Sequence, residues 1–252
     1  MMHKRKIMQT WRQFLFTVLM LAFALSSCVP VYRTNTLFMP AFEEKGDFVA
    51  EASLGTGDLS VNAGYAASQN LALFAGYQNR SLDDGTSGNY FYELGLGWFS
   101  GQSQSISSEI LGSFGYGQFS YYKRHKPIFS DSHHQRFINT DHMRSALQYN
   151  LHFHVSPMTF SLGSRFVYAH FNHFEDLIIR EATGSVVNHE TASNFARIYL
   201  EPMGTLTLNV KQISVFAQSG FVFLLHGDTS IFSHDVFTMN FGIRYRMNHL
   251  NR

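Results

Sequence analysis

Apolar and polar residues alternate along most of the chain after residue 47, with the period of two that is typical of half-buried β-strands. In the clearest stretch, from Leu147 to Val155, the apolar Leu, Tyr, Leu, Phe and Val alternate with Gln, Asn, His and His. Similar rows recur along the chain, and together they predict about ten strands, within a range of eight to twelve. The other rows lie in residues 48–54, 59–65, 71–77, 90–98, 109–121, 158–162, 198–208, 215–223 and 237–245.

The connections between these predicted strands alternate between short and long. The short ones are residues 67–69, 156–157 and 211–212, and the long ones are 80–89, 123–141, 173–194 and 226–235. Outer-membrane barrels sort their connections in this way, with short periplasmic turns and longer outer loops. The pattern therefore predicts an all-β fold, a closed antiparallel transmembrane β-barrel with short periplasmic turns and long outer loops.

The strand faces opposite the apolar rows carry small, polar and charged residues. A charged side chain facing lipid near the bilayer midplane costs about 2–4 kcal/mol, so we expect these faces to line the barrel interior. We interpret the charged set as an ionic network that plugs the lumen, in preference to a catalytic constellation. The predicted lumen network comprises Glu51, Glu93, Glu109, Glu201, Arg144, Arg165, Arg197, Arg244 and Arg246.

The composition fits a protein with much apolar surface. Aromatic residues make up 15% and charged residues also 15%, against about 25% charged residues in a typical soluble domain. The formal net charge of +1 gives no basic face for nucleic acid, which we exclude as a partner. The single cysteine, Cys28, rules out an internal disulfide framework.

The N-terminal segment has the layout of a cleaved export signal. Positive charges at residues 4–6 precede an apolar core at residues 14–25, which is shorter than the ~20 residues needed to span a membrane as a helix. The core ends at Leu25-Ser26-Ser27-Cys28, which resembles a lipobox. This resemblance implies that residues 1–27 are removed and that Cys28 becomes the acylated N-terminus. Two or more acyl chains anchor a protein stably to a membrane.

The chain is expected to divide into four parts. Residues 1–27 are the signal peptide, 28–46 a lipidated tether, 47–247 the barrel and 248–252 a C-terminal tail. No acidic residue follows Cys28 at Val29 or Pro30, which favours delivery to the bacterial outer membrane. We expect a lipid-anchored protein with a periplasmic N-terminus, whose first strand runs outward. Its expected partners are outer-membrane lipid and the acyl chains on Cys28.

The lipobox, the Glu-Lys-Gly-Asp of residues 44–47 and the glycine-rich alternating strands together resemble the lipoprotein branch of the outer-membrane β-barrel family. The resemblance covers the chain after Cys28 as a pattern, so it implies a fold and carries over no functional residue. Pro202 lies within a predicted strand, where it removes one ladder hydrogen bond.

Residues that could carry chemistry are few. Histidines gather at 125–142 and 170–189, but their spacing matches no metal site, and we interpret them as solvated side chains. Asp83-Asp84 could act with them at an outer rim, whereas Gly55-Thr56-Gly57 reads as a strand turn. No cofactor or metal is expected.

The favoured function is a structural or surface-interaction role, with an unknown ligand at the long loops and no enzymatic activity. Two alternatives stay open. One is an outer-membrane enzyme acting on lipid or peptide at the barrel rim, and the other is a periplasmic, lipid-tethered β-barrel that binds a small apolar ligand.

Overall fold

The computed structural model describes residue 32 and residues 34–55, 58–80, 89–100, 105–125, 134–180, 183–227 and 236–247. The predicted signal peptide, the predicted lipidation site Cys28, Asp83-Asp84 and the predicted tail 248–252 lie outside these residues. Within the described residues there is no helix long and apolar enough to cross a membrane.

The described chain is built from β-strands. In chain order they are β1 (Phe48–Gly55), β2 (Asp58–Ala66), β3 (Leu71–Arg80), β4 (Asn89–Phe99), β5 (Ile106–His125), β6 (His134–Val155), β7 (Met158–Arg180), β8 (Val186–Val210), β9 (Ile213–Phe221), β10 (Phe223–His226) and β11 (Phe237–Met247).

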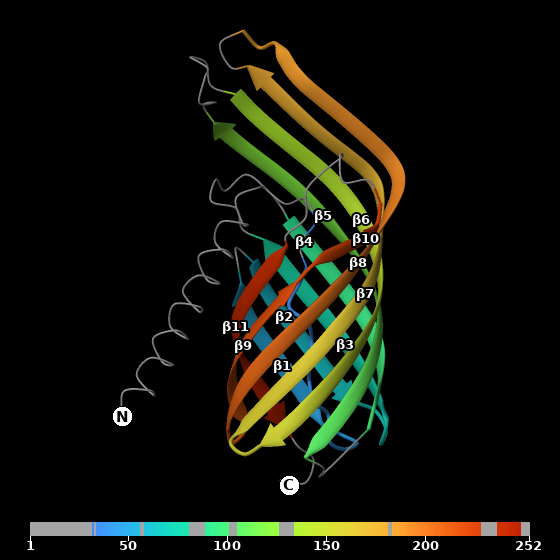
Figure 1. The fold of residues 1–252 in the computed structure, drawn as a ribbon, viewed down its shortest axis with the longest axis vertical. Helices are drawn as coiled ribbons and strands as arrows, with labels where there is room; N and C mark the ends of the chain where they lie inside the picture. Colours follow the sequence, from blue (N-terminus) through green and yellow to red (C-terminus); the bar gives the residue numbers. More distant parts are fainter. Residues whose placement is uncertain are drawn as a thin grey trace, which may run out of the picture.

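The strands form one closed antiparallel barrel (Figure 1). Each strand from β1 to β8 pairs with the next one along the chain, β9 pairs with β8 and β11, and β11 closes the barrel on β1. Strands β9 and β10 follow each other along β8 on either side of Val222. The described residues therefore supply ten strand positions, as the alternation of apolar and polar residues predicts.

Pro202 explains why the ninth strand position is interrupted. Pairing between β8 and β9 ends at Met203–Gly220, and pairing between β8 and β10 begins at Leu200–Phe223. Pro202 therefore lies beside the break. A proline has no N–H to donate to the neighbouring strand, so the ladder of hydrogen bonds is interrupted on this side. On its other side Pro202 faces Ser164 of β7, so β8 continues through the proline.

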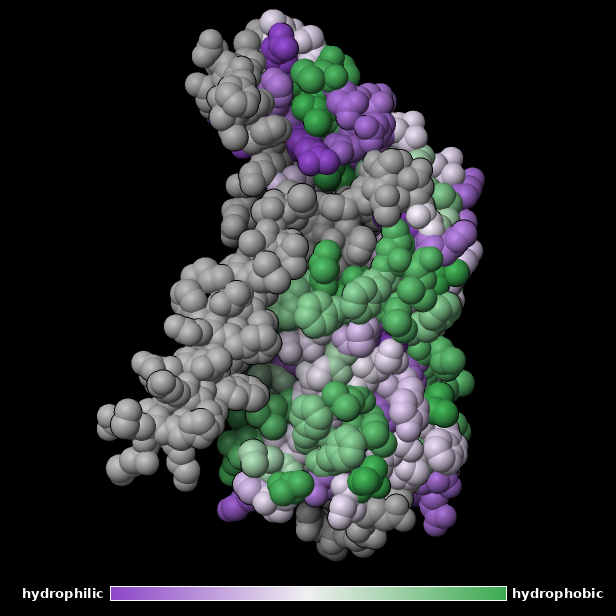
Figure 2. All heavy atoms as spheres, in the orientation of Figure 1, coloured by the Kyte–Doolittle hydropathy of each residue, from purple (hydrophilic) through white to green (hydrophobic). Residues whose placement is uncertain are grey.

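The apolar rows face outward and the charged faces line the interior, as predicted. Leu54, Leu94 and Ile243, each in one of the apolar rows, are 65%, 68% and 59% exposed. Glu51 and Arg244, on the opposite faces of β1 and β11, are buried. Figure 2 shows hydrophobic side chains over the barrel wall. Large apolar side chains exposed all around a closed wall are typical of a lipid-facing surface.

Strands β5–β8 run well beyond their neighbours and form a projecting sheet, which we call the arm (Figure 1). The arm consists of residues 119–125, 134–140, 174–180 and 186–192, which are in register with one another. Pairing of β4 with β5 ends at Tyr90–Gln118, below the arm.

The arm corrects the prediction of two long loops at 123–141 and 173–194, because both ranges are mostly strand. In these ranges the alternation of apolar and polar residues that marks a half-buried strand is interrupted, for example where Phe137 and Ile138 follow Gln135 and Arg136. Of the other predicted long loops, most of 80–89 and of 226–235 lies outside the described residues. The short connections at 156–157 and 211–212 are tight turns, as predicted.

Candidate functional site: the occupied barrel lumen

The barrel lumen is filled by the chain that precedes β1. We call Tyr32 and residues Thr34–Phe42 the lumen segment; every residue in it is buried. It makes hydrogen bonds or packing contacts with strands from all around the wall. The sequence pattern predicts a tether for residues 28–46 and does not indicate a segment within the barrel.

The first contacts of the lumen segment lie toward the long-loop end of the barrel. The rings of Tyr32 and Tyr199 stack with their centroids 3.9 Å apart, and both residues are 1% exposed or less. The Tyr32 hydroxyl donates to Glu201 Oε1 at 2.7 Å, and Thr34 Oγ1 donates to Glu201 Oε2 at 2.8 Å. Glu201 Oε2 also accepts a hydrogen bond from Arg165 Nε at 2.7 Å. One wall carboxylate is thereby bound by a wall arginine and by two residues of the segment.

Asn35 joins this cluster to a second one. Its side-chain oxygen accepts from Arg144 Nη2 at 2.6 Å and from Arg165 Nη2 at 2.8 Å. Its amide nitrogen donates to Glu93 Oε2 at 3.0 Å, and Arg144 Nη2 lies 3.3 Å from the same oxygen. A neutral amide, with an acceptor on one side and donors on the other, can bridge cations and an anion together.

The middle of the segment is held by neutral hydrogen bonds. The Leu37 N–H donates to Gln218 Oε1 at 2.9 Å, and Gln218 Nε2 donates back to the Leu37 carbonyl at 3.1 Å. Thr36 Oγ1 lies 2.8 Å from Ser53 Oγ of β1, and Gln148 Nε2 donates to the Phe38 carbonyl at 2.7 Å. Three backbone groups of this irregular buried segment thus receive partners from the wall, as buried backbone polar groups require.

Two glycines in the wall leave room for apolar side chains of the segment. A Cβ added at Gly64 would lie 2.8 Å from the rings of Phe38 and Phe42, and one added at Gly163 would lie 2.3 Å from Met39. Any larger residue at either position would therefore collide with the segment. The wall is shaped to receive these three side chains.

The last contacts lie at the short-turn end. The Phe42 N–H donates to Glu109 Oε1 at 2.9 Å, and Glu109 Oε2 accepts from Asn150 at 3.0 Å and lies 3.2 Å from His152 Nε2. The Gly46 N–H then donates to the Ala66 carbonyl at 2.8 Å, beside the β2–β3 turn. The lumen segment therefore runs the length of the barrel, from the long-loop end to the short-turn end, before β1 begins.

The predicted network residues fall into separate groups instead of one continuous cluster. Glu93, Glu201, Arg144 and Arg165 meet around Asn35, as described above. Glu51 accepts from Arg244 Nη2 at 3.0 Å across the β1–β11 seam. The side chain of Arg246 is partly exposed at the short-turn end, where it pairs with Glu43 and donates to the Pro40 and Ala41 carbonyls. Arg197 is fully buried near the long-loop end, two residues from Tyr199.

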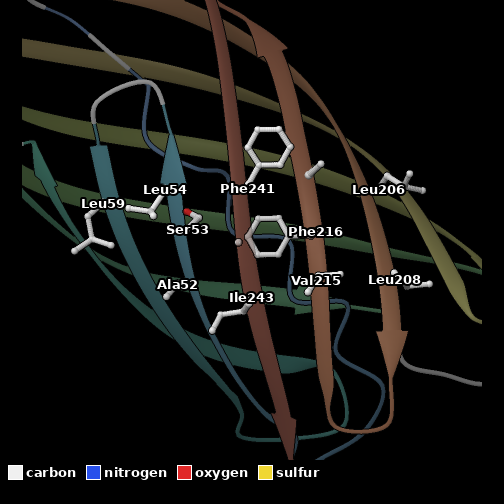
Figure 3. A pocket seen from close by; sticks show the side chains of 12 residues that line it. Ala52, Ser53, Leu54, Leu59, Leu206, Leu208, Val215, Phe216, Phe241 and Ile243 are labelled. Carbon is white, nitrogen blue, oxygen red and sulfur yellow. The ribbon is translucent and has the colours of Figure 1, made fainter.

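Two hollows lie at the barrel itself, among the described residues. One, of about 690 Å³, is a polar cavity at the short-turn end of the lumen, lined by residues that include His154, Thr207, Lys211 and Arg246. The other, of about 730 Å³, is a shallow apolar groove on the outside of the wall across β1, β11, β9 and β8 (Figure 3). Leu54, Leu206 and Phe241 border the groove, whose position on the lipid-facing surface suits acyl chains of the bilayer in general.

The described histidines do not gather into a metal site. Within the described residues no three His, Cys, Asp or Glu side chains are placed to hold a metal ion. His142 stacks between the rings of Phe91 and Phe171, with centroids 5.6 Å and 5.4 Å away, so it packs instead of being solvated. His189 Nε2 lies 3.0 Å from Glu175 on the exposed arm. His133 lies outside the described residues.

No protein-family model matches the sequence, and no curated relative matches it either. Solved structures with a similar fold include the outer membrane protease OmpT from Escherichia coli, at 7% identity and a TM-score of 0.48, covering 84% of this chain and 99% of that one. The translocator domain of the autotransporter NalP from Neisseria meningitidis is similar at 13% identity and a TM-score of 0.38, covering 79% and 87%. The KdgM porin is similar at 9% identity and a TM-score of 0.37, covering 80% and 99%. At such low identity the likeness concerns the fold of outer-membrane β-barrels alone.

The pairing of Arg165 with Glu201 predicts a coupled loss of stability. Arg165→Leu leaves a buried carboxylate without its cation, which typically costs about 3–5 kcal/mol. We expect a lower unfolding temperature in detergent, followed by the gel mobility of the heated protein, and partial recovery in the Arg165→Leu/Glu201→Leu double variant.

The control for this pair is Glu175→Leu on the arm. Glu175 Oε1 lies 3.0 Å from His189 Nε2, and the two side chains are 37% and 47% exposed. Exposed pairs contribute about 0–1 kcal/mol, so this variant should unfold near the parent temperature. Equal losses in the two single variants, or no recovery in the double variant, would contradict a stabilising role for the buried cluster.

Proposed function

We propose that this chain is an outer-membrane lipoprotein barrel that is closed by its own lumen segment and presents the arm for surface interaction. The observation that carries this proposal is the filling of the lumen by residues 34–42, which occupy the path that a solute would need. A barrel whose interior is used for its own chain serves as a platform, and its functional surface is then what it displays outside the membrane.

The arm suits an interaction role because it presents a sheet on which apolar and charged side chains are both accessible. Val186 and Val187 are 59% and 47% exposed, and Phe137 is 37% exposed. Phe137 also borders a hollow of about 500 Å³ formed with Tyr121 and Tyr122. Exposed aromatic and aliphatic side chains on a rigid element are typical of protein interaction surfaces.

The geometry favours this proposal over the two alternatives from the sequence. A periplasmic carrier for an apolar ligand needs an apolar interior, whereas the interior here is lined by buried Glu, Arg, Asn and Gln side chains and occupied by the segment. A rim enzyme needs a constellation of catalytic groups. Among the described residues at the long-loop end, the close His189–Glu175 pair is exposed on the arm, away from any cavity.

The lipid-facing wall predicts an asymmetric response to charge. Leu94→Arg places a cation in the middle of β4, where the side chain points outward, and a cation at the bilayer midplane costs about 2–4 kcal/mol. Val187→Arg makes the same kind of change at an exposed position of the arm and should be nearly neutral. Unfolding temperatures in lipid vesicles measure the difference. If both variants match the parent, the wall does not face lipid.

The lipobox resemblance predicts the fate of Cys28. Cys28→Ala removes the only thiol of the chain, so the variant should accumulate as an unprocessed precursor without acyl label. The control Ser26→Ala keeps a small residue beside the cysteine and should be processed normally. The measurement is incorporation of labelled palmitate together with the mass of the protein. Labelled fatty acid on Cys28→Ala would refute lipidation at this position.

The proposed orientation predicts where trypsin cuts intact cells. Arg180, at the end of the arm, and Lys211, in the β8–β9 turn, are both exposed. We expect cleavage after Arg180 in intact cells, and after Lys211 only once the outer membrane has been opened, with peptides identified by mass spectrometry. Cleavage after Lys211 in intact cells, with Arg180 spared, would reverse the orientation.

A further inference from the structure

The direction of the lumen segment determines on which side of the membrane the preceding chain must lie. Tyr32 stacks on Tyr199, and Tyr199 pairs with Val167 of β7. The next residue of β7, Tyr168, faces outward and is 46% exposed, so Tyr32 lies level with aromatic residues on the outside of the wall. Aromatic residues form girdles at the two interfaces of outer-membrane barrels.

The distance from Tyr32 to the short-turn end is large. Val210, where β8 ends at the β8–β9 turn, lies eleven positions after Tyr199 along the strand. With a rise of about 3.3 Å per residue and a tilt of about 40°, this stretch spans roughly 28 Å along the barrel axis. Tyr32 therefore lies most of a bilayer's hydrocarbon thickness away from the short-turn end.

Four residues lead from Cys28 to Tyr32, and an extended chain of four residues covers at most about 14 Å. Such a reach is about half the distance back to the short-turn end. The barrel wall, whose backbone is hydrogen-bonded all around, also separates the lumen from the bilayer. A lipid on Cys28 can thus reach a bilayer leaflet only over the rim at the long-loop end.

We infer that the chain before Tyr32 leaves the barrel at the cell surface, so that the acyl chains on Cys28 enter the outer leaflet of the outer membrane. This inference rests on the proposed function, which supplies both the lipidation and the orientation of the barrel. It replaces the periplasmic N-terminus predicted from the sequence. The protein is then a surface-anchored lipoprotein threaded through its own barrel, and the partner of its N-terminus is outer-leaflet lipid.

The contacts of the segment explain why it stays threaded. Asn35 and Thr34 bind side chains of the wall that are themselves charged and buried, and Phe38 and Met39 occupy space left by glycines. If the segment were withdrawn, Glu201 would lose two hydrogen-bond donors, Tyr32 and Thr34, and Glu93 would lose one, Asn35. The segment is consequently a fixed part of the barrel and holds the N-terminus at one end.

The direct test places one hydrophilic epitope at three positions in the full-length, lipidated protein. The first insertion lies between Val31 and Tyr32, which leaves the lipobox and the lumen segment intact. The second lies between Thr183 and Gly184, in the turn at the end of the arm, and the third follows Arg252, beyond the end of β11. Antibody binding is measured on intact cells and again after the outer membrane has been opened.

We expect the epitopes before Tyr32 and at Thr183 to be detected on intact cells, and the epitope after Arg252 only in opened cells. Detection at Thr183 but not before Tyr32 on intact cells overturns the inference and leaves the proposed orientation standing. Detection after Arg252 but not at Thr183 overturns the orientation, and with it the proposed function. The two failures are thus distinguishable.

A disulfide tests the path of the segment independently. Thr36 and Ser53 face each other with their hydroxyls 2.8 Å apart, so Thr36→Cys/Ser53→Cys should form a disulfide, and in denaturant neither thiol should react with a maleimide until the disulfide is reduced. Thr34→Cys/Ser53→Cys, in which the first cysteine lies two residues earlier in the segment, should form no disulfide, so both thiols should react once the protein is denatured. Reactive thiols in the first pair, or protection in both pairs alike, would mean that the segment does not follow this path.

Discussion

The structure depends on one constraint. The charged side chains inside the barrel are removed from water, so other groups of the protein must bind them. Glu93 and Glu201 point from the wall into the lumen and are 6% and 0% exposed. A buried ion is tolerated when it is paired and its remaining lone pairs are hydrogen-bonded. Arg144 and Arg165 supply the opposite charge, and Asn35, Thr34 and Tyr32 supply the remaining donors. The wall and the lumen segment therefore complete each other, and neither has its hydrogen bonds satisfied alone.

The parts of this arrangement that could be predicted are those that the membrane imposes. Lipid outside the wall requires an apolar side chain at every second position, so rows such as Leu147–Val155 reveal the strands and their outward face. The same alternation assigns Glu51, Glu93 and Arg165 to the interior. Sequence alone could not tell which carboxylate meets which arginine, because that depends on the register between strands that can lie far apart in the chain, such as Glu51 with Arg244 across β1 and β11.

The lumen segment and the arm were not predicted from the sequence, and the physical reason is the same for both. Thr34–Phe42 is surrounded by wall on every side, so no alternation of environments is imposed on it, and the polar Thr-Asn-Thr before Leu37 resembles a solvated linker. In the arm, the polar Gln135 and Arg136 are adjacent, and so are the apolar Phe137 and Ile138, so the alternation of apolar and polar residues is interrupted. A signal that depends on strict alternation between two unlike faces marks neither a wholly buried segment nor a strand in which that alternation is interrupted.

The contacts of the segment also constrain how the barrel can close. Its partners belong to strands that lie across the lumen from one another: Ser53 on β1, Glu93 on β4, Gln148 on β6 and Gln218 on β9. Once β11 has paired with β1, the wall is continuous, and Phe38 and Met39 could reach their places beside Gly64 and Gly163 only by sliding along a lumen lined with paired charged side chains. A segment so tightly fitted is more readily enclosed by strands that assemble around it than inserted afterwards. The same order of events would leave the chain before Tyr32 at the long-loop end from the moment of closure, because the fit that holds the segment in place also prevents it from being withdrawn.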